Sequence, residues 1–286
     1  MQKRSNDLYG KCAVDSSGRR EFLKSAVAAV GGTAAAYGLL SQMETNTASA
    51  QIVAKDDKRL HTETIIYPGQ TGNIIAYWAR PKGKEGLPAV IVIHENRGLN
   101  DHIRDVTRRM ALEGFLAIAP DALSPLGGTP ADQAEVGGMF GKLNNQDTVK
   151  NFVAAVQYLK THPLTNGKVG CTGFCWGGGM TNQVAVNSPD LVAAAPYYGS
   201  QPAAEDVTKI KASMVLHYAS QDTRINSGIP AYENALKSAG VNYQLYMYEG
   251  AQHAFNNDTN TSRYNKEAAE LAWKRTVDLF KAKLQS

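Results

Sequence analysis

The sequence has few cysteines, no apolar run of membrane-spanning length and little excess of either charge. Three cysteines in 286 residues exclude a small scaffold held together by disulfides. The 30 Lys and Arg residues nearly balance the 26 Asp and Glu residues, so the formal charge of +4 gives no reason to expect a nucleic-acid partner. No fixed-period repeat, heptad pattern or low-complexity block occurs, which leaves solenoid and coiled-coil folds without support.

What the sequence does contain is enough apolar material for a substantial core, since 43% of its residues are hydrophobic. α/β folds of this length are often single domains. Residues 1–50 differ in character from the remainder. We therefore expect one domain over residues 51–286, preceded by a segment with another purpose.

That segment, residues 1–50, resembles a twin-arginine export signal. Arg19 and Arg20 precede an Ala/Gly-rich apolar stretch, and Ala48-Ser49-Ala50 matches the small-residue pattern of a cleavage site. A membrane anchor is the alternative, but residues 25–40 fall short of the ~20 residues that a spanning helix needs. We expect the twin-arginine translocase as a transient partner, cleavage near Ala50, no stable membrane anchor and a periplasmic or secreted product.

The mature chain would keep only Cys171 and Cys175, because Cys12 lies before the arginines. An oxidising compartment makes a disulfide worth considering. A strand residue and a residue in the turn after that strand have Cα atoms roughly 10 Å or more apart, beyond the ~7 Å limit for bridging. We expect two free thiols. Zinc ligands usually come as two closely spaced pairs, so the C-x3-C spacing does not predict a zinc site either.

Strands and helices alternate along the mature chain. Two strands flanking residues 69–73 predict an antiparallel hairpin. Further strands are expected at residues 89–94, 115–120, 168–173, 192–199, 213–219 and 243–250, and helices at 101–114, 147–162, 178–187, 228–239 and 266–284. This order predicts an α/β fold: a mostly parallel central sheet with helices on both faces and an N-terminal hairpin.

A cysteine lies between glycines in "GFCWG", residues 173–177, directly after a predicted strand. The pattern G-x-nucleophile-x-G is typical of a sharp strand-to-helix turn that projects a nucleophile. Gly173 and Gly177 are needed there because a Cβ would strike the turn or the following helix. We expect the helix N-terminus to favour the thiolate of Cys175. A buried structural cysteine in a glycine-rich turn is the alternative.

Two more residues follow predicted strands in the order that α/β-hydrolases use: nucleophile, acid, histidine. Asp222 comes just after the strand at 213–219, and His253 lies on the loop before the last helix. The sequence has six histidines, and only His253 occupies this place. The three positions together favour a nucleophilic hydrolase.

At residues 61–284 the sequence resembles the dienelactone hydrolase family, through "HENRGLN", "APDALS", "GFCWGGG", "QDTRI" and "GAQHAF". The resemblance implies catalytic roles for Cys175, Asp222 and His253, and a glutamate at Glu95 that contacts the thiol. It also implies an oxyanion hole formed by the backbone N–H groups of Asn96 and Trp176. The competing zinc motif H-E-x-x-H is broken by Gly98, so we expect neither a metal nor a cofactor.

The implied reaction is attack of the Cys175 sulfur on an ester or lactone carbonyl, with a thioester acyl-enzyme that water cleaves. In the family, arginines grip a substrate carboxylate, one of them shortly after the histidine, where this chain has Asn256 and Asn257. The substrate-binding candidates are Arg97, Arg224 and Tyr198, although Arg97 and Arg224 could each equally be a solvated loop charge. The alternatives are a general carboxylesterase or thioesterase and a non-catalytic exported binding protein on the same scaffold.

Overall fold

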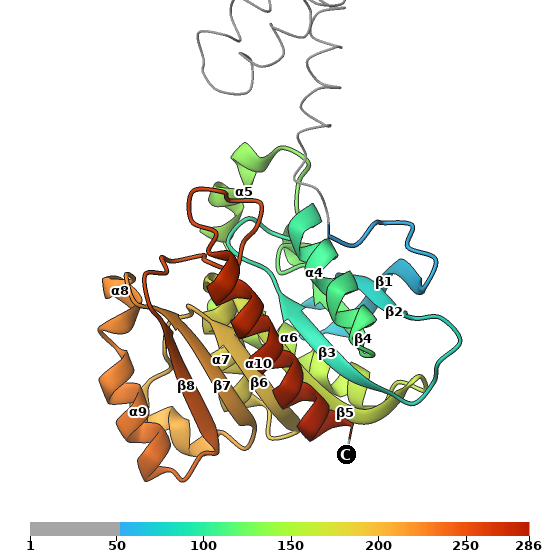
Figure 1. Ribbon diagram of the computed structural model, residues 1–286. Helices are drawn as coiled ribbons and strands as arrows, with labels where there is room; N and C mark the ends of the chain where they lie inside the picture. The colour runs from blue at the N-terminus through green and yellow to red at the C-terminus, as the bar shows by residue number, and fades with distance from the viewer. Residues whose placement is uncertain (1–51, 286) are drawn as a thin grey trace, which may run out of the picture. The chain divides into compact units, whose positions relative to one another are not determined.

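The structure is a computed structural model that describes residues 52–285 (Figure 1). The predicted export signal, residues 1–50, lies outside the described residues, so it stays a prediction. The strands are β1 (Leu60–Gly69), β2 (Gly72–Pro81), β3 (Leu87–Ile93), β4 (Leu116–Pro120), β5 (Thr165–Phe174), β6 (Leu191–Tyr197), β7 (Ser213–Ala219) and β8 (Tyr243–Tyr248). The α-helices are α4 (Asp101–Leu112), α5 (Gln133–Phe140), α6 (Asn145–Lys160), α7 (Trp176–Asn187), α8 (Thr223–Asn226), α9 (Ile229–Ser238) and α10 (Lys266–Leu284).

All eight of these strands form one sheet in the order β1-β2-β4-β3-β5-β6-β7-β8. β1 pairs with β2, and β2 with β4, in antiparallel fashion, whereas every pairing from β4 to β8 is parallel. This confirms the predicted α/β architecture, with its N-terminal hairpin at one edge of the sheet. Two 3-10 turns, residues 124–126 and 204–209, complete the regular structure.

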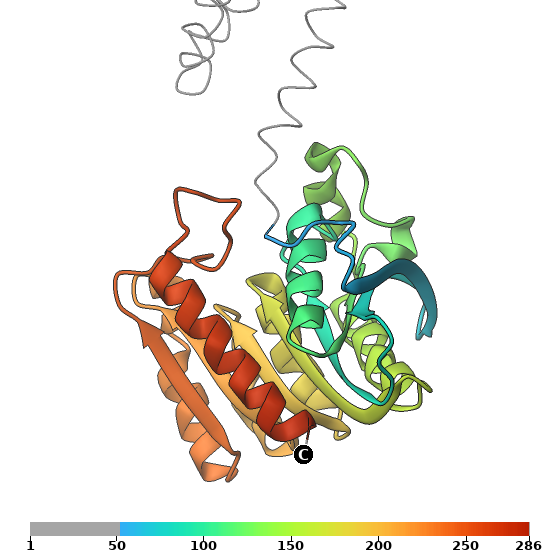
Figure 2. The same cartoon turned by 45° about the vertical axis from the view of Figure 1, so that its right-hand side comes forward.

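The central strands are buried on both faces because helices cover both faces. Along β3, Ala89, Ile91 and Ile93 pack into a cluster with side chains of α6, α7 and α9, while Val90 and Val92 pack into a cluster with side chains of α4 and α10. Figures 1 and 2 show α4 and α10 lying across one face of the sheet. The period-2 alternation of a strand thus feeds both clusters from one apolar run.

The parallel arrangement brings the carboxyl ends of β3, β5, β7 and β8 to the same edge of the sheet. Ligand sites in such sheets lie beyond this edge, where loops lead from strands into helices. The residues that follow these four strands include Glu95, Cys175, Asp222 and His253. Among the described residues, no helix is long and apolar enough to cross a membrane.

Candidate active site

Cys175 occupies the single residue between β5 and α7, at the N-cap of the helix. Its φ of 55° and ψ of −115° lie outside the regions that side chains usually adopt. The glycines on either side are required by close approach. A Cβ on Gly173 would collide with the carbonyl oxygen of Gly177, and one on Gly177 would collide with the carbonyl oxygen of His94. The sharp turn leaves the Cys175 side chain partly exposed.

Burial and four neighbouring groups act on the Cys175 thiol: Glu95, Asp222, Arg224 and the backbone N–H of Trp176. Burial raises the thiol pKa, and the Glu95 carboxylate raises it further. The backbone N–H of Trp176 and the Arg224 guanidinium act in the opposite direction but do not outweigh them. The N–H of Trp176, the first residue of α7, thus acts in the expected direction, but burial and the Glu95 carboxylate outweigh it. These surroundings favour the protonated thiol of Cys175, which would need a base to lose its proton.

The His253 side chain is held at the same edge of the sheet by Asp222. The His253 Nδ1 lies 2.5 Å from Asp222 Oδ2, and Asp222 is 7% exposed. Because the carboxylate accepts from Nδ1–H, the imidazole is fixed in the tautomer whose Nε2 can take up a proton. Tyr198 packs edge-on against the His253 ring, with 5.1 Å between ring centroids. The acid and the histidine predicted from the sequence thus form a hydrogen-bonded pair.

Glu95 is buried and has a partner that the sequence analysis did not assign. Its Oε2 accepts a hydrogen bond from Asn257 Nδ2 at 2.7 Å. Asn257 lies four residues after His253, on the same loop. Where the family resemblance suggested an arginine near this position, the chain places a neutral amide on the glutamate. The residue could have been singled out from its spacing to His253, but its partner could not.

The side chain of Trp176 is fixed by aromatic neighbours. The His94 ring stacks on it at 5.5 Å, and Phe140 of α5 meets it edge-on at 5.0 Å. His94 Nδ1 donates to the Glu95 carbonyl oxygen at 2.7 Å, and its Nε2 accepts from the Ala122 N–H at 3.1 Å. Burial lowers the pKa of His94, so this ring stays neutral. These contacts hold the start of α7 beside the residues that follow β3.

The remaining predicted candidates differ in their exposure. Asn96 and Arg97 are exposed in the turn after β3, and Arg224 is exposed at the start of α8. Tyr198 is almost fully buried, with a φ of 38°. Burial, followed by the charges of Glu95 and Cys175, raises its pKa well above the ordinary value for a tyrosine.

An open cavity of about 510 Å³ adjoins the Asp222–His253 pair. It is lined by Gln221, Asp222, Arg224, Gln252, His253 and Arg263. Arg263 was not singled out in the sequence, because it lies ten residues beyond His253 in a loop with no motif of its own. Cys171 and Cys175 are both free, as predicted. Within residues 52–285, no group of three or more His, Cys, Asp or Glu side chains is placed to hold a metal ion.

The sequence model of the dienelactone hydrolase family matches residues 74–284. The chain belongs to this family. Among its relatives, the putative carboxymethylenebutenolidase of Escherichia coli K12 is 35% identical over 251 residues, which cover 82% of this chain and 91% of that protein. The protein of the same description from Saccharolobus solfataricus is 33% identical, over 74% of this chain and 95% of that one.

Solved structures of dienelactone hydrolases share the fold. The putative dienelactone hydrolase of Klebsiella pneumoniae aligns with a TM-score of 0.70 at 29% identity, over 77% of this chain and 98% of that one. A dienelactone hydrolase-like promiscuous phosphotriesterase from metagenomic libraries aligns with a TM-score of 0.68 at 25% identity, over 79% of this chain and 99% of that one. The chain is thus a dienelactone hydrolase-like hydrolase with an α/β-hydrolase fold.

Proposed function

We propose that this hydrolase cleaves an ester or lactone bond with Cys175 as nucleophile, His253 as general base and Asp222 as the residue that orients it. The observation that carries the proposal is the 2.5 Å contact between His253 Nδ1 and Asp222, at the edge of the sheet where Cys175 stands on its strained turn. A nucleophile, a base and an orienting acid at one site are what thiol-based acyl transfer requires.

In the proposed reaction, His253 Nε2 takes the thiol proton as the sulfur bonds to the carbonyl carbon. The carbonyl oxygen becomes an oxyanion, which the backbone N–H groups of Asn96 and Trp176 stabilise. Collapse of this intermediate expels the alcohol, which receives the proton from His253, and leaves a thioester on Cys175. Water deprotonated by His253 then attacks the thioester, and the acid product leaves as the thiol is restored.

Glu95 keeps the thiol protonated in the resting enzyme, in this proposal. The direction of the Cys175 pKa supports it, because burial and the Glu95 carboxylate both disfavour the thiolate. A protonated thiol reacts slowly with oxidants, since the thiolate is the reactive form. Substrate that displaces Glu95 would then allow His253 to take the proton.

The test uses p-nitrophenyl acetate with the mature protein, residues 51–286. We expect turnover that iodoacetamide abolishes, and we expect substrate to slow this inactivation. A panel of lactones, aryl esters and thioesters then separates a lactonase from a general carboxylesterase or thioesterase. Absence of turnover on every member of the panel would favour a non-catalytic binding protein instead.

We propose Arg224 as a substrate-contacting residue. Its guanidinium acts on the Cys175 thiol and lines the cavity beside His253. Within residues 52–285, the Arg224 guanidinium forms no ion pair with a carboxylate, so its charge is available to a ligand. We expect Arg224→Gln to raise KM for esters that carry a carboxylate and to leave KM for p-nitrophenyl acetate unchanged.

We also propose export through a twin-arginine signal, on the strength of Arg19, Arg20 and Ala48-Ser49-Ala50. The double substitution Arg19→Lys and Arg20→Lys keeps the charge but removes the guanidinium geometry. We expect an uncleaved precursor in the cytoplasm, beside a wild-type product that begins near Gln51. Cell fractionation with N-terminal sequencing checks this. A periplasmic mature form of the double variant would instead indicate a general secretory signal.

A further inference from the structure

The loop between β8 and α10, residues 249–265, carries His253 and has no helix or strand of its own. Side chains anchor it at several points. Gly250 N–H donates to Ser220 Oγ at 2.9 Å, and Phe255 is fully buried. Beyond His253, the loop is held by polar contacts to residues that precede or belong to α4. A loop of this length stays in one place only if such contacts fix it.

Two consecutive residues of the loop make these polar contacts. Asn257 donates to Glu95, and Asp258 Oδ2 lies 2.6 Å from an Arg109 guanidinium nitrogen on α4. His102 Nδ1, one helical turn or more before Arg109, lies 3.1 Å from the other Asp258 oxygen. The Asp258 side chain is 14% exposed and that of Arg109 is 17% exposed, so water screens this ion pair only in part.

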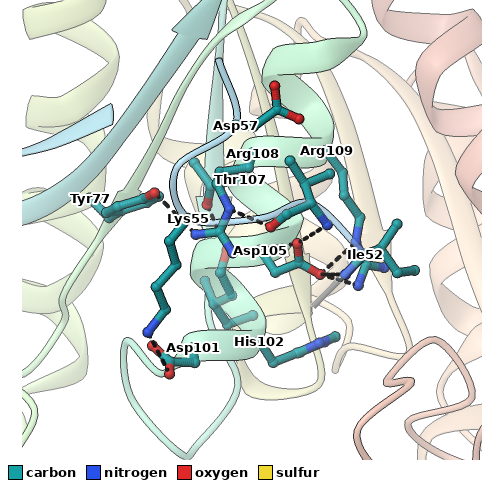
Figure 3. Close-up of polar contacts among 12 residues, drawn as sticks. Ile52, Lys55, Asp57, Tyr77, Asp101, His102, Asp105, Thr107, Arg108 and Arg109 are labelled. Carbon is teal, nitrogen blue, oxygen red and sulfur yellow. Dashed lines mark hydrogen bonds and ion pairs between the residues drawn. The ribbon is translucent and has the colours of Figure 1, made fainter. Parts of the chain in front are cut away.

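The same Arg109 guanidinium also binds Asp105, on its own helix and one turn earlier. Asp105 is 2% exposed and accepts from the backbone N–H groups of Ile52 at 3.1 Å and Val53 at 2.8 Å. Figure 3 shows the Asp105 carboxylate pointing toward both Arg109 and Ile52, with dashed lines marking its contacts. Two backbone N–H groups already satisfy part of the Asp105 carboxylate. The Arg109 guanidinium therefore has donors left for Asp258 and pairs with both carboxylates.

The charges of this cluster are matched to one another. Burial alone would raise the pKa of Asp258, but His102 and Arg109 together lower it below the ordinary range, so the carboxylate is ionised at neutral pH. Arg108 joins the same cluster: its Nη2 lies 3.5 Å from Asp105 Oδ1, and its Nε donates to the Val53 carbonyl oxygen at 2.9 Å. A salt bridge between a helix and a catalytic loop, 149 residues apart in sequence, fixes geometry that neither element fixes alone.

We propose that Arg109 and Asp258 are positioning residues, which hold the loop of residues 249–265 so that His253 keeps its pairing with Asp222 and Asn257 its contact with Glu95. This inference rests on the proposed function, because it assigns the pair an effect on the base of that reaction. Neither residue touches substrate or the thiol. They act by fixing the position of the loop and therefore of His253. A displacement of a catalytic base by about 1 Å can lower the rate by up to ~10²-fold.

The experiment compares Asp258→Asn, Arg109→Met and the double variant in the mature protein. We expect each single variant to lower kcat for p-nitrophenyl acetate by about tenfold or more, with KM little changed. The kcat of the double variant should be no lower than that of the more impaired single variant, because the two substitutions break the same Arg109–Asp258 contact. Arg109→Met also deprives buried Asp105 of one of its two arginine partners and can fail to fold, whereas Asp258→Asn leaves the Arg109–Asp105 contact in place.

The matched control is Lys281→Met. It breaks the 2.7 Å ion pair between Lys281 of α10 and Glu113, the residue that ends α4, and does not touch the loop. We expect wild-type kcat from this variant. A second measurement follows the side-chain 15N shifts of His253, which report the ring nitrogen that carries the proton. We expect the Nδ1–H tautomer in the wild type and in the control, and a mixture in Asp258→Asn.

Wild-type kcat together with an unchanged His253 tautomer in Asp258→Asn would overturn the proposal. So would a loss of activity that only follows a lower melting temperature, with the tautomer unchanged well below it. The tautomer is measured without substrate. An inactive wild type with the expected tautomer change would therefore count against the proposed function and not against the positioning pair.

Discussion

The interior of β5 and the turn that follows it hold the two cysteines of the described chain in opposite environments. Cys171 is fully buried, packs with α6 and α7 side chains, and has its Sγ 3.7 Å from Thr181 Oγ1. Burial raises its pKa to about 12. Cys175, four residues later, is partly exposed on a strained turn among Glu95, Asp222 and Arg224. Both thiols have raised pKa values, so reactivity here depends on access and on a base, not on the thiolate fraction at rest.

The largest expected effect separates the two thiols directly. Cys175→Ala should reduce ester hydrolysis to the level of the uncatalysed reaction, because no other nucleophile stands on the turn, while Cys171→Ala should retain wild-type kcat. Steady-state kinetics with p-nitrophenyl acetate on both purified variants checks this. Equal loss in the two would mean that the turn has no special chemistry.

The next largest expected effect tests whether His253 and Asp222 are what make Cys175 reactive. His253→Ala and Asp222→Asn should each lower kcat/KM by ~10³-fold or more, the second because the imidazole loses its fixed tautomer. Asp121 provides a matched carboxylate: it accepts from the Thr129 N–H at 2.6 Å and the Leu123 N–H at 3.0 Å, and serves its own loop. Asp121→Asn should affect stability rather than the catalytic step. Full activity in Asp222→Asn would reverse these assignments.

A smaller effect concerns the charge beside Cys175. Glu95→Gln removes a negative charge that disfavours the thiolate, so the Cys175 pKa should fall and iodoacetamide should react faster at a given pH below it. The measurement is the pH dependence of the alkylation rate, with Cys171 in the same molecule as an unreactive reference. An alkylation midpoint that stays in place, or moves to higher pH, would show that Glu95 does not act on the thiol.

The smallest expected effect is on stability, where Cys171 should matter more than Cys175. Cys171→Ala leaves a small cavity in the core and should lower the free energy of unfolding by ~1 kcal/mol. Cys175→Gly should leave stability unchanged or raise it, since glycine adopts a φ of 55° without strain. Urea unfolding of both variants provides the numbers. A Cys171→Ala variant more stable than the wild type would contradict the structural role of Cys171 in the core.

The sequence predicted the strands and long helices because their apolar runs and caps are local signals. The β3 strand, for example, is a continuous apolar run, and α4 is preceded by its N-cap Asn100, whose side chain accepts from the Ile103 N–H. The α5 helix was missed: it carries Gly137 and Gly138, which oppose a helix, and only one of its residues is buried. Its Phe140 nevertheless reaches Trp176.

The candidate site divides in the same way. Cys175, Asp222 and His253 could be singled out as candidates because each follows a strand in a known order, and the structure brings Asp222 and His253 into contact. The contacts of Asn257 and Asp258 could not be predicted, since they join the β8–α10 loop to residues 162 and 149 positions away. The net direction of the Cys175 pKa also required the structure, because it depends on burial.

The hydrogen bonds from the backbone N–H groups of Ile52 and Val53 to Asp105 have a practical consequence for recombinant production. A chain that starts at β1, the first regular element, would look complete on a secondary-structure diagram. It would nevertheless leave the Asp105 carboxylate without both amide donors and Arg108 without the Val53 carbonyl oxygen, in a part of the molecule where charges are costly to leave unsatisfied. The gene should therefore be cut upstream of Ile52, and a protease site or affinity tag placed before that residue.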